Sequence, residues 1–160
     1  MRAARARSWC PILLSTSAAS SHRNRSPGSP WSRSYIIDGS TYFIHGGWQD
    51  PVDQYLYAIA ETDIPEGAET FFAGHTHVQV LLDVKGRTFC NPGAVGQPRD
   101  GDPRCVCDVR ERAYRVRRVD YDIDETAFHM KKAGFPAKCY ENLYIGAQIG
   151  GRIDKITLAV

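Results

Sequence analysis

Three histidines stand where short apolar runs end, and their side chains are the ones in this sequence best suited to hold a metal ion. His75 and His77 occur in the run Gly74-His75-Thr76-His77, where a turn can aim both rings at one point outside the preceding strand. His45 follows another apolar run and precedes two glycines, which let the backbone approach a ligand closely. Imidazole suits Zn, Mn, Fe and Ni alike. From their spacing alone, a metal site and ordinary polar residues at strand ends explain these histidines equally well.

The sequence around these histidines predicts short strands joined by tight turns. Two β-rich runs, Ser34–Asp38 and Thr41–His45, flank Gly39-Ser40, which is typical of a hairpin. This hairpin places His45 at the end of a strand. The remaining apolar runs predict strands over Glu69–Ala73, Val78–Val84 and Arg87–Cys90, a turn at Lys85-Gly86, and a second hairpin with arms Cys105–Arg110 and Ala113–Asp120.

Helical patterns follow in three places. The stretch from Pro51 to Thr62 begins with a proline suited to a first helical position and has an apolar face made of Val52, Tyr55, Leu56 and Ile59. A second helix is expected over Glu125–Lys132, capped by Asp122 or Asp124. A third is expected over about 136–144.

Residues 1–34 differ from the rest of the chain in charge and composition. They carry six Arg and no acidic residue, whereas the whole chain of 160 residues has a net charge of only +2. This Arg- and Ser-rich segment is predicted to be disordered, and residues 35–160 to form the folded domain. A transit peptide, a shortened secretion signal and a wrongly assigned start all remain open. We favour the last, because GC-rich codons read out of frame give this excess of Arg, Ala, Ser, Pro and Gly.

Composition narrows the class of protein. Hydrophobic residues make up 42% and charged residues 24%, as in folded globular proteins. No apolar run approaches the roughly 18 to 20 residues that cross a bilayer, so no membrane span is expected. The charge gives no case for a nucleic-acid partner. The five Cys do not have the spacing of a disulfide framework, which indicates reduced thiols in a cytoplasmic protein. Cys105 and Cys107 could bind a metal, but we favour a role as buried apolar side chains.

Two longer motifs resemble one enzyme family. The run from Phe72 to His77, followed by the run from Asn91 to Arg104, closely resembles the calcineurin-like metallophosphoesterase family in its small bacterial and archaeal branch. The likeness covers roughly residues 35–151. It implies an α/β (α+β) fold, the αββα sandwich in which two mixed β-sheets pack face to face between helices. The chain would form the C-terminal portion of that domain.

The resemblance also implies a site. His45 and His75 would be ligands of one metal ion and His77 of a second, with the two ions holding a hydroxide and the phosphoryl oxygens of a phosphate-ester substrate. A supporting role would fall to Gly74, Asn91 and Gly93, with the turn from 91 to 93 lying under the histidine loop. Arg99 and Arg104 are candidates for contacting a substrate phosphate, but for loop arginines we favour simple solvation.

The chain departs from the family in its carboxylate ligands. Complete members also contain Asp-x-His, Gly-Asp and Gly-Asn-His motifs, none of which occurs in place here. Two divalent ions without a carboxylate would repel each other by several kcal/mol even at an effective dielectric of ~20. We therefore expect at most one ion (Mn, Fe, Zn or Ni), bound by His45, His75 and His77. We also expect that the chain is truncated, that it is inactive alone, and that it self-associates through its exposed sheet.

Three functions remain open from the sequence. We favour the first, in which the chain is a truncated form of a hydrolase of phosphomonoesters or phosphodiesters. The second is a non-catalytic interaction module that keeps the fold without the metals. The third is a single-metal histidine-site protein such as a cupin-like barrel, ranked last because Val78–Leu82 offers no acidic residue after the His-x-His pair.

Overall fold

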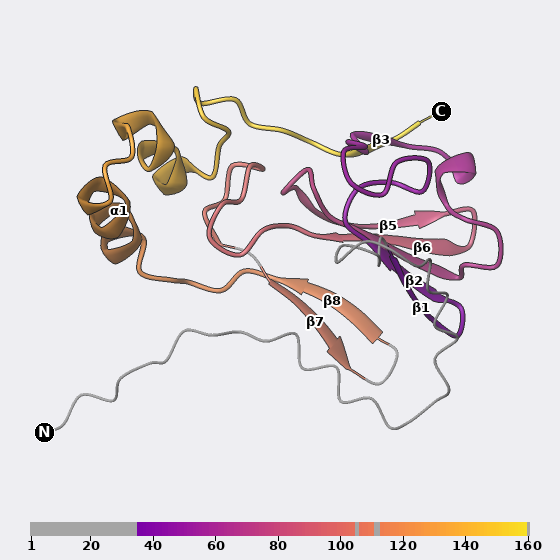
Figure 1. Ribbon diagram of the computed structural model, residues 1–160. Helices are drawn as coiled ribbons and strands as arrows, with labels where there is room; N and C mark the ends of the chain where they lie inside the picture. Colours follow the sequence, from indigo (N-terminus) through magenta and orange to yellow (C-terminus); the bar gives the residue numbers. More distant parts are fainter. Residues whose placement is uncertain (1–34, 105, 111–112, 160) are drawn as a thin grey trace, which may run out of the picture.

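The structure is a computed structural model that describes residues 35–104, 106–110 and 113–159 (Figure 1). The disorder predicted for residues 1–34 and the role predicted for Cys105 lie outside the described residues.

A mixed five-stranded sheet forms the centre of the described chain, and it confirms the α/β fold class. Its order is β1-β2-β4-β6-β5. The three central strands run parallel to one another, whereas the two outer strands are antiparallel to their neighbours. The strands are β1 (Tyr35–Asp38), β2 (Thr41–Ile44), β4 (Thr70–Ala73), β5 (Gln79–Val84) and β6 (Arg87–Pro92). Each one was predicted from the sequence to within two residues.

The alternation of side chains along the strands separates the two faces of this sheet. Tyr42, Phe71 and Phe89 are aligned across β2, β4 and β6, and the last two are fully buried. They belong to the main core, in which the buried residues are Leu56, Ile59, Ile64, Ala68, Phe71, Ala73, Val78, Val84, Phe89 and Ile156. The opposite face carries Phe43 stacked on Phe72, with ring centroids 4.8 Å apart.

The second face is covered by the later hairpin, which the sequence also predicted. Its strands are β7 (Val106–Arg110) and β8 (Ala113–Arg117), paired antiparallel. The Tyr114 ring meets Phe72 edge-on, 5.1 Å between centroids, and its hydroxyl lies 3.3 Å from Thr41 Oγ1. In the described residues, this two-stranded ladder is the second layer of the fold.

The helix predicted from Pro51 to Thr62 is wrong. The chain there forms a turn, then β3 (Ala58–Ile59) and the short 3-10 helix η1 (Glu61–Asp63). The Asp50 carboxylate caps this turn by accepting hydrogen bonds from the backbone N–H groups of Val52 and Asp53. The turn does not continue as a helix, because Pro51 O accepts from Gly46 N at 2.8 Å instead of from a later N–H. Parallel pairing of β3 with β9 (Thr157–Leu158) then holds the following residues extended. Local turn chemistry and a distant strand therefore overrule the apolar periodicity.

The C-terminal part contains one regular helix, as predicted, and two short turns in place of another. Helix α1 (Ile123–Lys132) begins where the Asp122 carboxylate accepts from Glu125 N, which confirms the predicted cap. The helix expected over 136–144 is wrong: this segment divides into the 3-10 helices η2 (Ala137–Cys139) and η3 (Glu141–Ile145). The two short helices meet at Tyr140, whose φ of −119° departs from helical geometry, and the buried Asn142 side chain donates to Ala147 O and closes the loop after η3.

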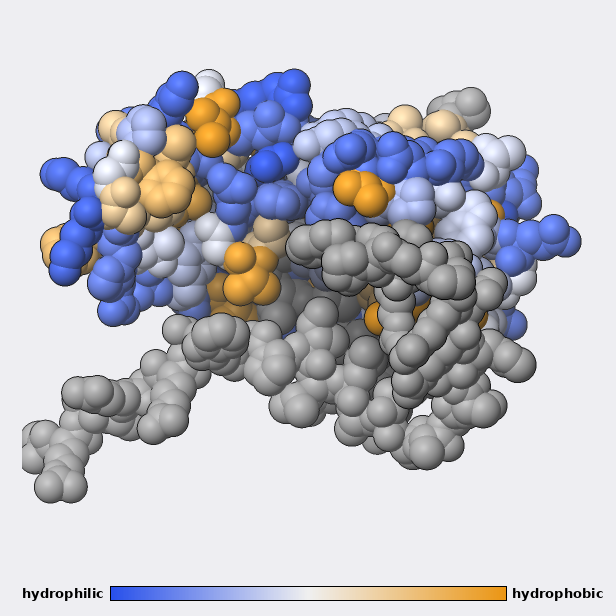
Figure 2. Space-filling view, viewed as in Figure 1, coloured by the Kyte–Doolittle hydropathy of each residue, from blue (hydrophilic) through white to orange (hydrophobic). Residues whose placement is uncertain are grey.

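Helix α1 lies beyond the end of the sheet and packs mainly against η3 (Figure 1). Tyr144 donates a hydrogen bond of 2.7 Å to Asp124 across this contact. Hydrophobic residues on the coloured part of the face in Figure 2 are scattered among hydrophilic ones. No helix in the described ranges is long and apolar enough to cross a bilayer.

Replacing Phe89 by Ala should lower the free energy of unfolding by about 3 to 5 kcal/mol, because a fully buried aromatic side chain leaves a cavity. Leu81→Ala is the control, since Leu81 is 37% exposed on the neighbouring strand, and it should cost about 1 kcal/mol or less. Urea unfolding followed by tryptophan fluorescence measures both. Equal losses in the two variants would contradict the assignment of the core to this face.

Candidate functional site

The candidate site lies at the carboxyl ends of the three parallel strands. Ile44 of β2 is paired with Ala73 of β4, so the residues that follow these two strands meet at the same edge of the sheet. Gly74 N donates to His45 O at 2.9 Å, and a Cβ at Gly74 would come within 3.3 Å of that oxygen. The missing side chain at position 74 therefore lets the two strand ends approach closely. Ligands of open α/β sheets commonly bind at this edge.

His45 and His75 are in direct contact at this edge. His75 Nδ1 lies 2.9 Å from His45 Nε2, and the ring centroids are 4.7 Å apart. One nitrogen must donate and the other accept, so a single proton lies between the rings. His75 Nε2, on the other side of its ring, is buried and has no hydrogen-bond partner in the described structure. A buried nitrogen without a partner costs about 1 to 3 kcal/mol, and native structures rarely leave such an atom unsatisfied.

The backbone of the histidine loop is held in an unusual conformation. His75 and His77 have φ angles of 62° and 60°, in the left-handed region that few residues other than glycine adopt. Each such residue costs of order 1 to 3 kcal/mol, and residues of this kind cluster at functional sites. Thr76 between them is fully buried, so its side chain holds the loop to the core between the two histidines.

His77 is oriented separately from the histidine pair. Its Nδ1 lies 2.9 Å from Gln97 O, and because a carbonyl oxygen only accepts, this nitrogen carries the proton. The lone pair of neutral His77 is therefore on Nε2. Histidines that bind metals are usually held in this way, with the second ring N–H donated to a carbonyl or carboxylate.

Asn91 at the end of β6 supports the loop from below. Its side-chain Nδ2 donates to Gly74 O and to Thr76 Oγ1, both at 2.8 Å, and its Oδ1 accepts from Gly93 N. The residue is fully buried. Asn91 thus ties the third parallel strand to the histidine loop and fixes the turn that follows.

The surroundings keep the loop histidines neutral. Burial lowers the pKa of His75, with a further contribution from the neighbouring His45. Burial also lowers the pKa of His77, and the positive charge of Arg99 acts in the same direction. Neutral imidazoles have a free lone pair at pH 7, which is the form that binds a metal.

These nitrogens fit the role of metal ligands, but they are few. Within residues 35–104, 106–110 and 113–159, no group of three or more His, Cys, Asp and Glu side chains is arranged to hold a metal ion. The structure thus brings His45 and His75 together and gives His77 its own orientation, without a single three-histidine cluster. The described chain therefore brings two imidazoles into contact and holds the third by a separate hydrogen bond.

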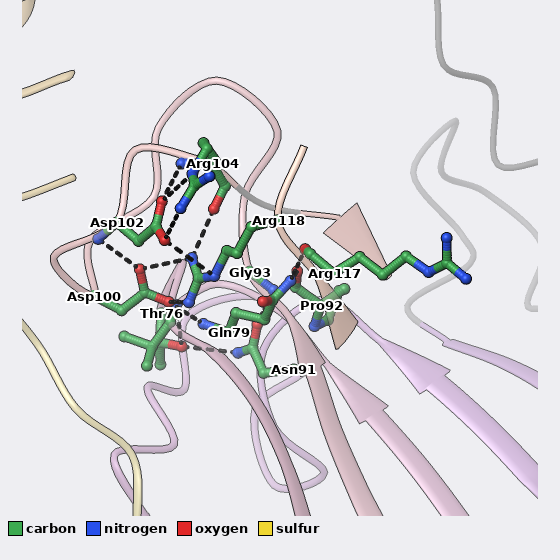
Figure 3. Close-up of polar contacts among 11 residues, drawn as sticks. Thr76, Gln79, Asn91, Pro92, Gly93, Asp100, Asp102, Arg104, Arg117 and Arg118 are labelled. Carbon is green, nitrogen blue, oxygen red and sulfur yellow. Dashed lines mark hydrogen bonds and ion pairs between the residues drawn. The ribbon is translucent and has the colours of Figure 1, made fainter. Parts of the chain in front are cut away.

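The loop between β6 and β7 is shaped by acidic residues paired with arginines (Figure 3). Asp100 accepts from Gln79 N at 2.8 Å and forms an ion pair of 2.8 Å with Arg118. Asp102 accepts two hydrogen bonds of 3.0 Å from the guanidinium of Arg104. Arg104 is therefore committed to a carboxylate, which differs from the simple solvation favoured from the sequence. No carboxylate in the described residues forms an ion pair with Arg99.

Three residues beside the histidines were not identified from the sequence. Tyr55 lies against the His75 ring, 4.0 Å between centroids. The carboxylate of Asp53 acts on the pKa of His75 in the raising direction, and Gln97 O orients His77. The Asp50-Pro51 turn signal would have placed Asp53 and Tyr55 in a loop near the strand ends, but the helical periodicity was preferred.

Known proteins resemble this chain in sequence and in fold. A sequence profile described as the calcineurin-like phosphoesterase superfamily domain matches residues 21–112. The chain is also 33% identical to a metallophosphoesterase from Sphaerobacter thermophilus of known crystal structure, with a TM-score of 0.64 over 72% of this chain and 60% of that one.

Two archaeal proteins are similar as well. An uncharacterized protein of Methanocaldococcus jannaschii is 28% identical over 123 residues, which are 65% of this chain and 51% of that protein. A hypothetical protein from Pyrococcus horikoshii shares the fold at 16% identity and a TM-score of 0.59, over 72% of this chain and 51% of that one. The chain therefore spans between half and two thirds of the length of these relatives.

Replacing Asn91 by Leu should lower the free energy of unfolding by about 1 to 3 kcal/mol, because Gly74 O and Thr76 Oγ1 would lose their buried donor. The loop should also move, so the ring signals of His75 and His77 in NMR spectra should shift. Phe89→Ala is the control, since it destabilises the core without touching the loop. Unchanged ring signals in Asn91→Leu would show that this side chain does not position the histidines.

The metal-free protein should become less stable as the pH falls below about 6.5, the ordinary histidine value. The folded state lowers the pKa of His77, so in this range the unfolded state binds more protons and acidification favours unfolding. His77→Gln should flatten the decline in melting temperature between pH 7.5 and 5.5, measured in EDTA. A decline of the same steepness in this variant would contradict the assigned shift.

Proposed function

We propose that this chain, which belongs to the calcineurin-like phosphoesterase superfamily as its matched residues 21–112 show, carries the histidine ligands of a metal-dependent phosphoesterase. The observation that supports this most directly is the buried, unpartnered Nε2 of His75 beside the contact with His45. An ordinary surface histidine has no reason to lose its hydrogen-bond partners at a strand end. The reaction class is hydrolysis of a phosphomonoester or phosphodiester.

In this proposal His45 and His75 hold one divalent ion and His77 holds a second. When bound, such ions polarise phosphoryl oxygens and lower the pKa of a water molecule toward neutrality. The chain contributes the orientation of the ligands. Gln97 O keeps the proton of His77 on Nδ1. The unpartnered Nε2 of His75 faces away from the 2.9 Å contact between His75 Nδ1 and His45 Nε2, so these two rings must turn before both can ligate one ion.

Carboxylates limit what the described residues do by themselves. Two divalent ions a few ångströms apart need anionic ligands to offset their repulsion, and the described chain offers no third ligand at either position. We propose that complete relatives supply these groups from the part of their length that this chain does not span. The 160-residue chain should accordingly bind metal weakly and turn over phosphate esters slowly or not at all.

Metal binding gives the sharper test of this proposal. Mn²⁺ titrated into the full chain should broaden the NMR signals of His45, His75 and His77 first, and His75→Ala should weaken the binding at least about tenfold. His129→Ala is the matched control, because His129 is exposed on α1 and should leave the affinity unchanged. Mn²⁺ that acts equally on all histidines would contradict the proposed ligands.

Turnover of bis(p-nitrophenyl) phosphate with Mn²⁺ tests the activity itself. We expect a rate close to that of the buffer for the isolated chain. If turnover occurs and His75→Ala abolishes it, the chain is a complete enzyme and the proposed need for further ligands is wrong. If the chain binds no Mn²⁺ and chelators leave its melting temperature unchanged, it is a non-catalytic module that keeps the fold.

A further inference from the structure

A cavity of about 350 Å³ opens beside the histidine pair. It is lined by Tyr55, Tyr57, Arg99, Gln148, Ile149 and Arg152. Its volume is within the range of small-molecule sites, which is about 300 to 1,000 Å³. Tyr55 belongs both to this lining and to the contact with His75, at 4.0 Å between ring centroids. Tyr55 therefore lies between the cavity and the histidine pair.

One wall of the cavity is aromatic. Tyr55 and Tyr57 are two residues apart, and their rings are nearly parallel at 11° with centroids 5.7 Å apart. Tyr55 is 49% exposed, which leaves part of its ring open. An exposed aromatic face of this kind binds flat rings by stacking.

Arg99 supplies positive charge to the same cavity. Its Nε is buried and has no hydrogen-bond partner in the described structure, and its nearest side-chain contact there is one of 3.5 Å to Gln97 Oε1. Arg99 N donates to His77 O at 3.0 Å, which places this residue beside the histidine loop. A guanidinium that lines a cavity without forming an ion pair with a carboxylate is suited to a phosphate oxygen.

The opposite wall is rigid. The buried carboxylate of Asp154 accepts from Tyr57 Oη at 3.0 Å and from Arg152 Nε at 2.8 Å, and it also accepts from the Gln148 amide. Asp154 N donates to Arg99 O at 2.7 Å. These contacts hold Tyr57 and the backbone of Arg99 in place, and Arg152 forms an ion pair with Asp154. Arg99 therefore remains the cation available to a ligand.

We propose that this cavity binds a phosphate ester that carries a flat aromatic ring, with the phosphate on Arg99 and the ring stacked on Tyr55. This inference rests on the proposed function, because it assigns a substrate class to the same site. Nucleoside monophosphates and aryl phosphates share this chemistry. The volume favours the nucleotide, since a single phenyl group would leave most of the cavity empty.

Binding to the metal-free full chain tests the inference separately from catalysis. Calorimetric titrations in EDTA would compare AMP, phenyl phosphate, glycerol 3-phosphate and adenosine. AMP should bind at least about tenfold more tightly than glycerol 3-phosphate or adenosine, because it alone engages both stacking and charge. Phenyl phosphate binding as tightly as AMP would assign the cavity to aryl phosphates. Glycerol 3-phosphate binding as tightly as AMP would overturn the inference.

Variants assign the two contacts. Arg99→Gln should weaken AMP binding by about tenfold or more, whereas Arg115→Gln, an exposed arginine on β8, should leave it unchanged. Tyr55→Leu should weaken AMP but not glycerol 3-phosphate, and Tyr55→Phe should restore AMP binding. Equal affinities in Arg99→Gln and the original chain would overturn the inference, with circular dichroism checking that each variant is folded.

Failure of this inference and failure of the proposed function have different signatures. Tight AMP binding without Mn²⁺ binding at the histidines contradicts the metal-dependent function and leaves the cavity assigned. Mn²⁺ binding at the histidines without AMP binding agrees with the metal-dependent function and contradicts the proposed substrate class.

Discussion

The histidine loop depends on one buried amide. Asn91 is fully enclosed at the end of the central parallel strands and bonds both a carbonyl and a hydroxyl of the loop above it. These bonds offset part of the cost of the left-handed backbone at His75 and His77, together with the bonds from Gly74 N to His45 O and from Arg99 N to His77 O. The same amide turns the chain at Gly93 toward the segment that carries Gln97 and Arg99. The placement of His75 and His77 thus depends on a residue that bonds the loop around them at Gly74 and Thr76.

Sequence periodicity predicted the sheet well, because its strands are short, apolar and bounded by glycine turns. Tyr35–Asp38, Thr41–Ile44 and Gln79–Val84 show the patterns that period-two alternation and turn residues predict. The segment from Pro51 to Thr62 was misassigned because its apolar spacing is helical, whereas its structure depends on an Asp50 turn and on strand β9 about a hundred residues later. Single-sequence patterns contain the first kind of information and lack the second.

The candidate site divides in the same way. Histidine is recognisable as a potential ligand from its type and its place after an apolar run, so positions 45, 75 and 77 could be found from the sequence. Their partners could not. The contact between His45 and His75, the Gln97 carbonyl that orients His77 and the Tyr55 ring beside them arise from segments that the fold brings together. The resemblance to a family supplied the chemistry, but it did not indicate the cavity around Arg99.

The ladder between β3 and β9 also affects how the protein is made. Ile59 is aligned with Leu158, and Ala159 N donates to Ile59 O, so two of the most separated described segments complete each other. Ribosomes extend a chain by about 5 to 20 residues per second, so Ile59 waits about 5 to 20 seconds for its partner. During translation the large sheet can assemble first, while the backbone of residues 58–59 stays unpaired. Nascent chains at that stage would present an open strand to chaperones.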